Sequence, residues 1–180
     1  MKGIGLIFIW TILLYSCKEV SFREPQPAGV SPVTQVPNTL HGRYTIVDDQ
    51  GKETDTLIIE SWGYHFKDAK DNDWLGKGVI SDSLVLKMYE NYYFVNFRIG
   101  DQWLLRLIKQ KPSGAIEFMS INISDDKKGN GMLKKLSKKF TVKEMKKKDD
   151  TFYQIKPTKE QLMQLIKEGY FTGHELSRLK

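Results

Sequence analysis

Cysteine and histidine are both scarce in this chain of 180 residues. Cys17 is the only cysteine, so no disulfide can form within the chain and stability must come from a packed core. The three histidines, His41, His65 and His174, are far apart and form no His-x-x-x-His pair. This spacing is not that of a metal site, and we expect neither a metal nor a cofactor.

Sequence motifs for catalysis are also lacking. The chain has no Gly-x-Ser-x-Gly elbow, no Walker loop and no dinucleotide fingerprint. Glu60 and Glu117 are candidate general acids without an evident partner base. The acidic loop 68–73 lacks the spacing, the central glycine and the closing glutamate of an EF-hand. We expect no catalytic residues and no enzyme activity, and a hydrolase that uses these carboxylates is the alternative.

No apolar run is long enough to cross a bilayer as a helix, which needs roughly 20 residues. The apolar segment 4–14 follows a basic start and has the length of a secretory signal core. It ends in Leu14-Tyr15-Ser16-Cys17 and resembles the signal peptide of bacterial lipoproteins. Leu14, Ser16 and Cys17 match the lipobox of that family, whereas Tyr15 departs from it.

The resemblance to lipoproteins implies a location in the cell envelope. Residues 1–16 would be removed as a signal peptide, and Cys17 would carry a diacylglyceryl group and a further acyl chain such as palmitate. Several chains make a stable anchor, because a single chain, at about 0.8 kcal/mol per buried CH₂, binds membranes only marginally. Lys18 after the cysteine implies sorting to the outer membrane, on either the periplasmic or the surface face. An ordinary secreted protein with a free cysteine is the alternative.

The remaining chain divides into a tether and one domain. Residues 17–38 contain four of the six prolines and predict an extended tether, followed by a single domain over residues 39–180. Hydrophobic residues make up 40% of the chain and aromatic residues 12%, which favours a folded body over disorder. The net charge of +6 would suit nucleic acid, but an exported protein meets anionic lipid or glycan instead, so we expect no nucleic-acid partner.

The domain is predicted to be mainly β. Strand-like segments separated by short turns are expected at 40–47, 56–61, 63–67, 74–80, 84–90, 92–98, 103–109, 115–123, 140–146 and 151–155. Such short links require antiparallel neighbours, and an antiparallel meander can remove its exposed edges by closing into a barrel of 8–10 strands. Gly42-x-Tyr44 resembles the Gly-x-Trp motif of lipocalin-like barrels, with tyrosine in place of tryptophan, and favours a barrel over a sandwich.

Helices are expected in the last third of the chain. Residues 127–148 contain ten lysines and one acid, and the apolar positions 133, 136 and 140 predict a short amphipathic helix. Its lysines form either a solvated surface or a contact for anionic headgroups or glycans. Thr158 and Gln161 predict a capping box, with Gly169 at the end of that helix. Thr172 and Glu175 repeat the cap pattern and predict a last short helix.

Alternation along three central strands predicts which face is interior. That face is apolar except for two charged residues, and it carries Tyr93, Val95, Phe97, Leu104, Arg106, Ile108, Glu117, Met119 and Ile121. Because a buried charge needs a partner, Arg106 is expected to pair with Glu117 or with a ligand anion. A slip of one residue would instead move both groups to the surface.

The functional interpretation is that Arg106, Glu117, Tyr93 and Phe97 bind a small amphiphilic or apolar ligand inside the barrel. Arg106 would bind its carboxylate or phosphate, as arginines do in the fatty-acid-binding barrels that this fold would resemble. The alternative is a non-enzymatic accessory subunit of an outer-membrane assembly, which would bind another envelope protein.

Overall fold

Short turns join the central strands into consecutive antiparallel hairpins, as the sequence predicts. The structure, a computed structural model, describes residues 18–47, 51–69, 76–123, 127–147 and 150–179. Signal-peptide cleavage and the acylation of Cys17 concern residues outside these ranges. The hairpin strands are β2 (Gly42–Val47), β3 (Glu53–Glu60), β4 (Gly63–Phe66), β5 (Lys77–Val79), β6 (Leu84–Tyr89), β7 (Tyr92–Ile99), β8 (Gln102–Gln110), β9 (Ile116–Ser120), β10 (Lys143–Lys147) and β11 (Asp150–Ile155).

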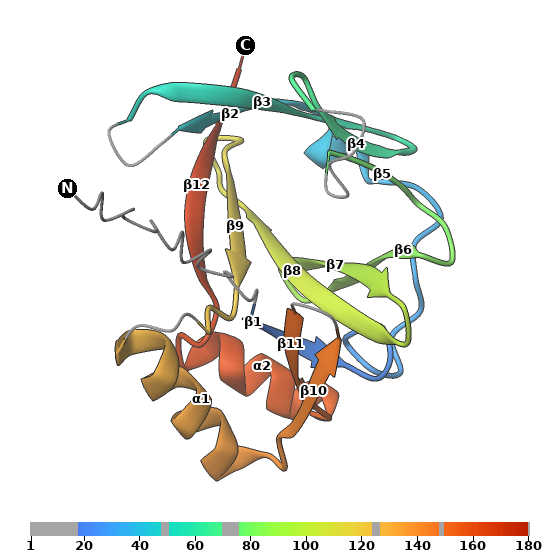
Figure 1. The fold of residues 1–180 in the computed structure, drawn as a ribbon. Coiled ribbons are helices and arrows are strands. Elements are labelled where there is room, and N and C mark those ends of the chain that lie inside the picture. The colour runs from blue at the N-terminus through green and yellow to red at the C-terminus, as the bar shows by residue number, and fades with distance from the viewer. Residues whose placement is uncertain (1–17, 48–50, 70–75, 124–126, 148–149, 180) are drawn as a thin grey trace, which may run out of the picture.

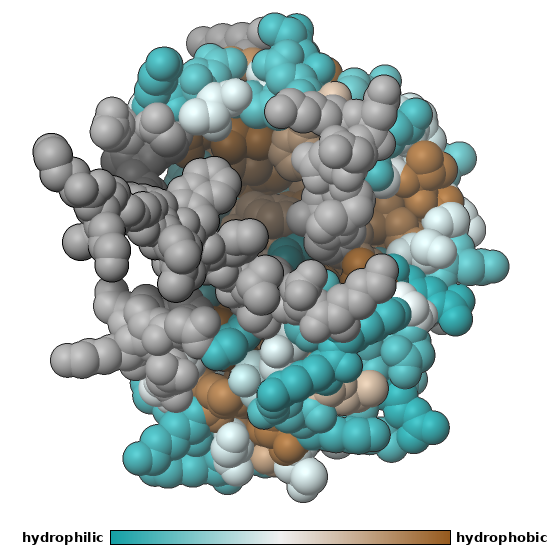
Figure 2. Space-filling model, viewed as in Figure 1, coloured by the Kyte–Doolittle hydropathy of each residue, from teal (hydrophilic) through white to brown (hydrophobic). Residues whose placement is uncertain are grey.

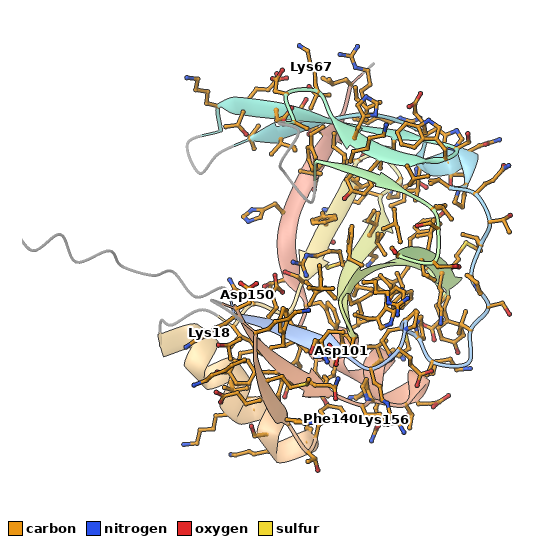
Figure 3. The ribbon with its side chains drawn as sticks, turned by 45° about the vertical axis from the view of Figure 1, so that its right-hand side comes forward. Lys18, Lys67, Asp101, Phe140, Asp150 and Lys156 are labelled. Atoms are coloured by element: carbon orange, nitrogen blue, oxygen red, sulfur yellow. The ribbon has the colours of Figure 1, made fainter. Side chains whose placement is uncertain are left out.

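Two strands that the sequence analysis did not predict join these hairpins into one sheet of 12 strands. β1 (Lys18–Phe22) pairs in parallel with β11 and antiparallel with β8. Lys18 and Asp150 lie at the same end of the parallel pair (Figure 3). β12 (Thr172–Arg178) lies between β9 and β2. The last helix predicted from Thr172 and Glu175 is therefore wrong, because pairing along two strands outweighs a weak local cap pattern.

The segment after β1 is not the extended tether that its prolines predict. Lys87 Nζ donates hydrogen bonds to the carbonyl oxygens of Pro25 at 2.7 Å and Pro27 at 2.9 Å. The Asn96 side chain accepts from the backbone N–H of Gln26 at 2.7 Å and donates to its carbonyl at 2.8 Å. Residues 18–38 therefore belong to the folded body, because buried side chains of the sheet supply the partners that a proline-rich backbone cannot find in a ladder.

The sheet curves strongly but does not close, so the expected barrel of 8–10 strands is wrong (Figure 1). Strands follow one another from β8 through β9, β12, β2, β3 and β4 to β5 on one side, and through β7 to β6 on the other. Among the described residues, no ladder joins β5 to β6; an isolated bridge between Ser81 and Leu84 marks the corner. The edge of β6 is instead met by the proline-rich segment, where Val33 N–H donates to the Leu86 carbonyl at 2.9 Å.

Two helices cover the outer face of β7, β8 and β9 and lie at the bottom of Figure 1. α1 (Lys127–Lys139) places Leu136 in the core, as the predicted amphipathic pattern requires. α2 (Lys159–Lys167) starts at Thr158, whose side chain accepts a hydrogen bond from the Gln161 N–H, while the Gln161 side chain accepts from the Thr158 N–H. The predicted capping box is thus confirmed. In the described part of the chain, no helix has the length and apolarity needed to span a membrane.

Two apolar clusters therefore lie on opposite faces of the same strands. Phe94, Leu105 and Leu107 point toward the helices, whereas Val95, Phe97 and Leu104 point into the concave side of the sheet. The period-two alternation of β7 and β8 produces this division, with one apolar layer for each face. The helix side is closely covered, and the concave side holds the cavity described next.

Candidate functional site

The concave side of the sheet forms a partly open, apolar cavity of about 310 Å³. Figure 2 shows apolar surface inside this hollow. Side chains from most of the curved sheet project into it (Figure 3), and its wall includes Leu57, Ile59, Tyr64, Phe66, Leu84, Leu86, Val95, Phe97, Arg106, Ile108, Phe118 and Leu176. Such a volume and such a lining are typical of sites for small apolar molecules, which occupy about 300–1,000 Å³.

Arg106 is the basic side chain within this wall, and its partner is Glu19 of β1. The guanidinium donates from Nη2 to Glu19 Oε1 at 2.6 Å and from Nη1 to Glu19 Oε2 at 3.3 Å. Ser21 pairs with Leu104, two residues from each member of the ion pair, and Glu19 itself forms an isolated bridge with Asn122, which follows β9. Both side chains are mostly buried, with 12% of Arg106 and 18% of Glu19 exposed. In a buried bidentate pair of this kind each charge compensates the other, and removal of one partner would leave the other charge buried and unpaired.

Glu117, the expected partner of Arg106, does not reach it. Ile108 pairs with Phe118 and Lys109 with Glu117, so Phe118 lines the cavity and Glu117 points to the other face of β9. The connection between paired Gln110 and Ile116 sets this register, which differs by one residue from the predicted one. A shift of one residue turns every side chain of a strand to the opposite face. Met119 and Ile121, predicted to be interior with Glu117, accordingly belong to the helix-side cluster.

The other two predicted site residues lie on the concave side. Phe97 lines the cavity and is 9% exposed. Tyr93 packs against the same cluster, with its hydroxyl 3.1 Å from Thr39 Oγ1. The structure thus brings together Phe97 and Arg106 in the wall and places Tyr93 beside them, while Glu117 stays outside.

Two further polar residues of the wall come from β12. His174 and Glu175 border the cavity, and both residues are exposed to solvent, so they mark its opening. His174 pairs with Phe118 on the concave face, whereas Glu175 pairs with Glu117 and its side chain is on the other face. Glu175 accepts a hydrogen bond from Lys111 Nζ at 2.5 Å, and this bond raises the pKa of Lys111. Glu175 was not predicted near the cavity because the local cap pattern predicts a helix for this segment.

Glu19 was missed for a different reason. The alternation of Val20, Ser21 and Phe22 is a short strand signal, but it stands between Cys17 and a run of prolines. Both neighbours favour a tether, so local pattern alone could not place Glu19 in the centre of a sheet. In the described part of the chain, no three His, Cys, Asp or Glu side chains lie close enough to hold a metal ion.

The Gly42 and Tyr44 pair lies where β2 meets β12. Tyr44 is fully buried, and its hydroxyl donates to the Leu40 carbonyl at 2.9 Å. Burial raises the pKa of Tyr44, an effect that the nearby Arg178 partly opposes. Gly42 has a positive φ of 153° and leaves room for the Arg178 side chain, which a Cβ at this position would crowd.

Comparison of this chain with protein-family models, with curated proteins and with solved structures finds no significant match.

Proposed function

We propose that this chain is a binding protein of the bacterial cell envelope, which holds a small apolar or amphiphilic ligand in the cavity of its curved sheet. The observation that carries the proposal is the apolar cavity of about 310 Å³ on the concave side of the sheet, with wall residues from β2–β4, β6–β9 and β12. A concave, mainly apolar hollow of this size is typical of a site for a small molecule. Each CH₂ group that a ligand buries there would contribute about 0.8 kcal/mol to binding.

Filling the cavity tests this function. Val95 lines the wall, and Val95→Phe would occupy ligand space, whereas Val79→Phe adds the same atoms at a site that is 49% exposed on β5. The full chain is held in lipid nanodiscs with decanol, and bound decanol is counted by native mass spectrometry after release. We expect Val95→Phe to retain at least tenfold less decanol than the wild type and Val79→Phe to retain the same amount. A wild-type chain that retains no decanol contradicts the proposed function.

The location in the envelope is a proposal that rests on the lipobox. Cys17 would be acylated at the residue immediately before β1, and β1 pairs with β8 and β11. The folded body would then lie directly at the membrane surface, without a spacer.

Metabolic labelling with an alkyne analogue of palmitate tests the anchor. We expect the wild-type chain to incorporate the label and Cys17→Ser to incorporate none, because the thiol and the new amino terminus at this residue are the acceptors. Lys18→Ser provides the neighbouring control and should keep the label. Equal labelling of the Cys17→Ser chain would contradict the anchor.

An accessory role in an outer-membrane assembly is the second candidate. Met88 and Val79 are 51% and 49% exposed, on strands β6 and β5 at the open side of the sheet. Exposed apolar side chains at strand edges suit a protein partner. A stable membrane complex that co-purifies with the chain, together with no bound ligand, would favour this second function over the first.

A further inference from the structure

The charged groups around the cavity cancel in pairs. Arg106 is neutralised by Glu19 inside the wall, and Glu175, whose side chain is on the outer face of β12 at the rim, is neutralised by Lys111. The other wall residues are mainly apolar, as Figure 2 shows for the visible part of the hollow. The cavity therefore contains a basic residue but offers no net positive charge to a ligand.

The donors of Arg106 that face its partner are already committed. Nη1 donates to Glu19 Oε2 and to the Leu105 carbonyl at 3.2 Å, and Nη2 donates to Glu19 Oε1. An anionic head group that approached the guanidinium would share one positive charge with the carboxylate of Glu19. Two negative charges would then face one positive charge in a poorly hydrated site, which is costly. A hydroxyl group brings no charge and can donate a hydrogen bond to the carboxylate.

The volume limits the size of the ligand. An apolar cavity of about 150 Å³ binds benzene, and the space in this chain is about twice as large. A ligand with on the order of ten carbon atoms fits this comparison. Decanol and decanoate share a ten-carbon skeleton and differ in the charge of the head group at neutral pH, so they form a matched pair of probes.

We propose that the cavity selects uncharged ligands, such as alcohols with a medium-length chain, and that Glu19 is the residue that excludes fatty-acid carboxylates. This inference rests on the proposed binding function and adds the class of ligand to it. Glu19 determines specificity through Arg106: while the ion pair is intact, the cavity is electrically neutral. Without the carboxylate, the same guanidinium becomes a site for an anion.

Competition between the two probes tests the selectivity. The full chain in lipid nanodiscs is given equal amounts of decanol and decanoate, and the bound ratio is measured by native mass spectrometry. We expect the wild type to retain decanol in at least tenfold excess, and Glu19→Gln to shift the ratio at least tenfold toward decanoate. Glu117→Gln removes the same charge from the other face of the sheet and should leave the ratio unchanged.

A second variant guards against a folding defect of Glu19→Gln. The double variant Glu19→Met with Arg106→Met removes both charges, so it leaves no buried charge unpaired. It should keep the preference for decanol, since nothing remains to bind a carboxylate. Circular dichroism shows whether each variant is folded.

Four results would overturn the inference. A wild-type preference for decanoate, or a Glu19→Gln chain that is folded and keeps the wild-type ratio, would contradict the role of Glu19 while leaving the binding function intact. Loss of the decanol preference in the double variant would show that the selectivity comes from elsewhere in the wall. Retention of neither probe by the wild type would overturn the proposed function as well.

Discussion

Lys87 is a basic residue inside the body, 7% exposed on β6. Burial lowers its pKa, and the negative charge of Glu24 opposes this shift. Its ammonium group is nevertheless placed between the carbonyl oxygens of Pro25 and Pro27. One charged side chain thereby fastens the proline-rich segment to the sheet and, with it, the strand that carries Glu19.

Replacement of Lys87 should destabilise this attachment. Lys87→Met removes a donor from the carbonyl groups of Pro25 and Pro27, of which Pro27 keeps only a long hydrogen bond from the Val30 N–H at 3.4 Å. An unsatisfied buried group costs about 1–3 kcal/mol. We expect the free energy of unfolding, measured by urea denaturation, to decrease by an amount within this range. Lys109→Met removes an exposed lysine that lies 5.6 Å from the Tyr92 ring. This control should change the free energy of unfolding by less than about 0.5 kcal/mol. An unchanged stability in Lys87→Met would show that the segment is held by other contacts.

At the scale of elements, β12 is the strand that turns a set of hairpins into a curved wall. It pairs with β9 through Thr172–Leu176 and with β2 through Ser177 and Arg178. Gly173 lies opposite Met119, and a Cβ at Gly173 would collide with the carbonyl oxygen of Phe118. In the helix predicted from the local sequence, the same glycine would only lower the helix propensity. Substitution of Gly173 therefore distinguishes the strand from the helix.

Replacement of Gly173 by alanine should therefore destabilise the fold. In a helix, Gly→Ala stabilises by roughly 0.5–1 kcal/mol, whereas overpacking against a neighbouring strand costs about 1–3 kcal/mol. We expect Gly173→Ala to lower the midpoint of thermal unfolding. Gly131→Ala, in α1 with no atom within 4 Å of the added Cβ, should raise it. Stabilisation by both substitutions would contradict the strand.

At the scale of the whole molecule, β8 is the strand where the two halves of the fold separate. One edge pairs with β7 through Gln102–Ile108, while the other pairs with β1 near Leu104 and with β9 from Leu107 onward. The sheet divides at this point: β1, β11 and β10 continue along the helices, and β9 and β12 turn upward around the cavity (Figure 1). Arg106 lies between these two pairings, at the fork of the sheet. Glu19 and Arg106 thus hold the branch point and the cavity wall together.

Much of this fold follows from local patterns. The positions of the hairpin strands, the amphipathic character of α1 and the capping box of α2 are confirmed, because turn residues and periodicity act over a few neighbouring positions. On β7 and β8 the alternation also placed Phe97 and Arg106 on the concave side. The same reasoning failed on β9, where a difference of one residue in the connection turned Glu117 away.

The sequence by itself determined the mainly β composition of the fold, the hairpins and the need of Arg106 for a partner, since each depends on local geometry or on the cost of burying a charge. Only the tertiary structure decided that this partner is Glu19, that β1 and β12 are strands and that the sheet stays open. These features depend on pairing between segments far apart in the chain: Glu19 and Arg106 are separated by 87 positions. No local pattern records such a pairing, because its free energy comes from the partner strand and not from the residues of the segment.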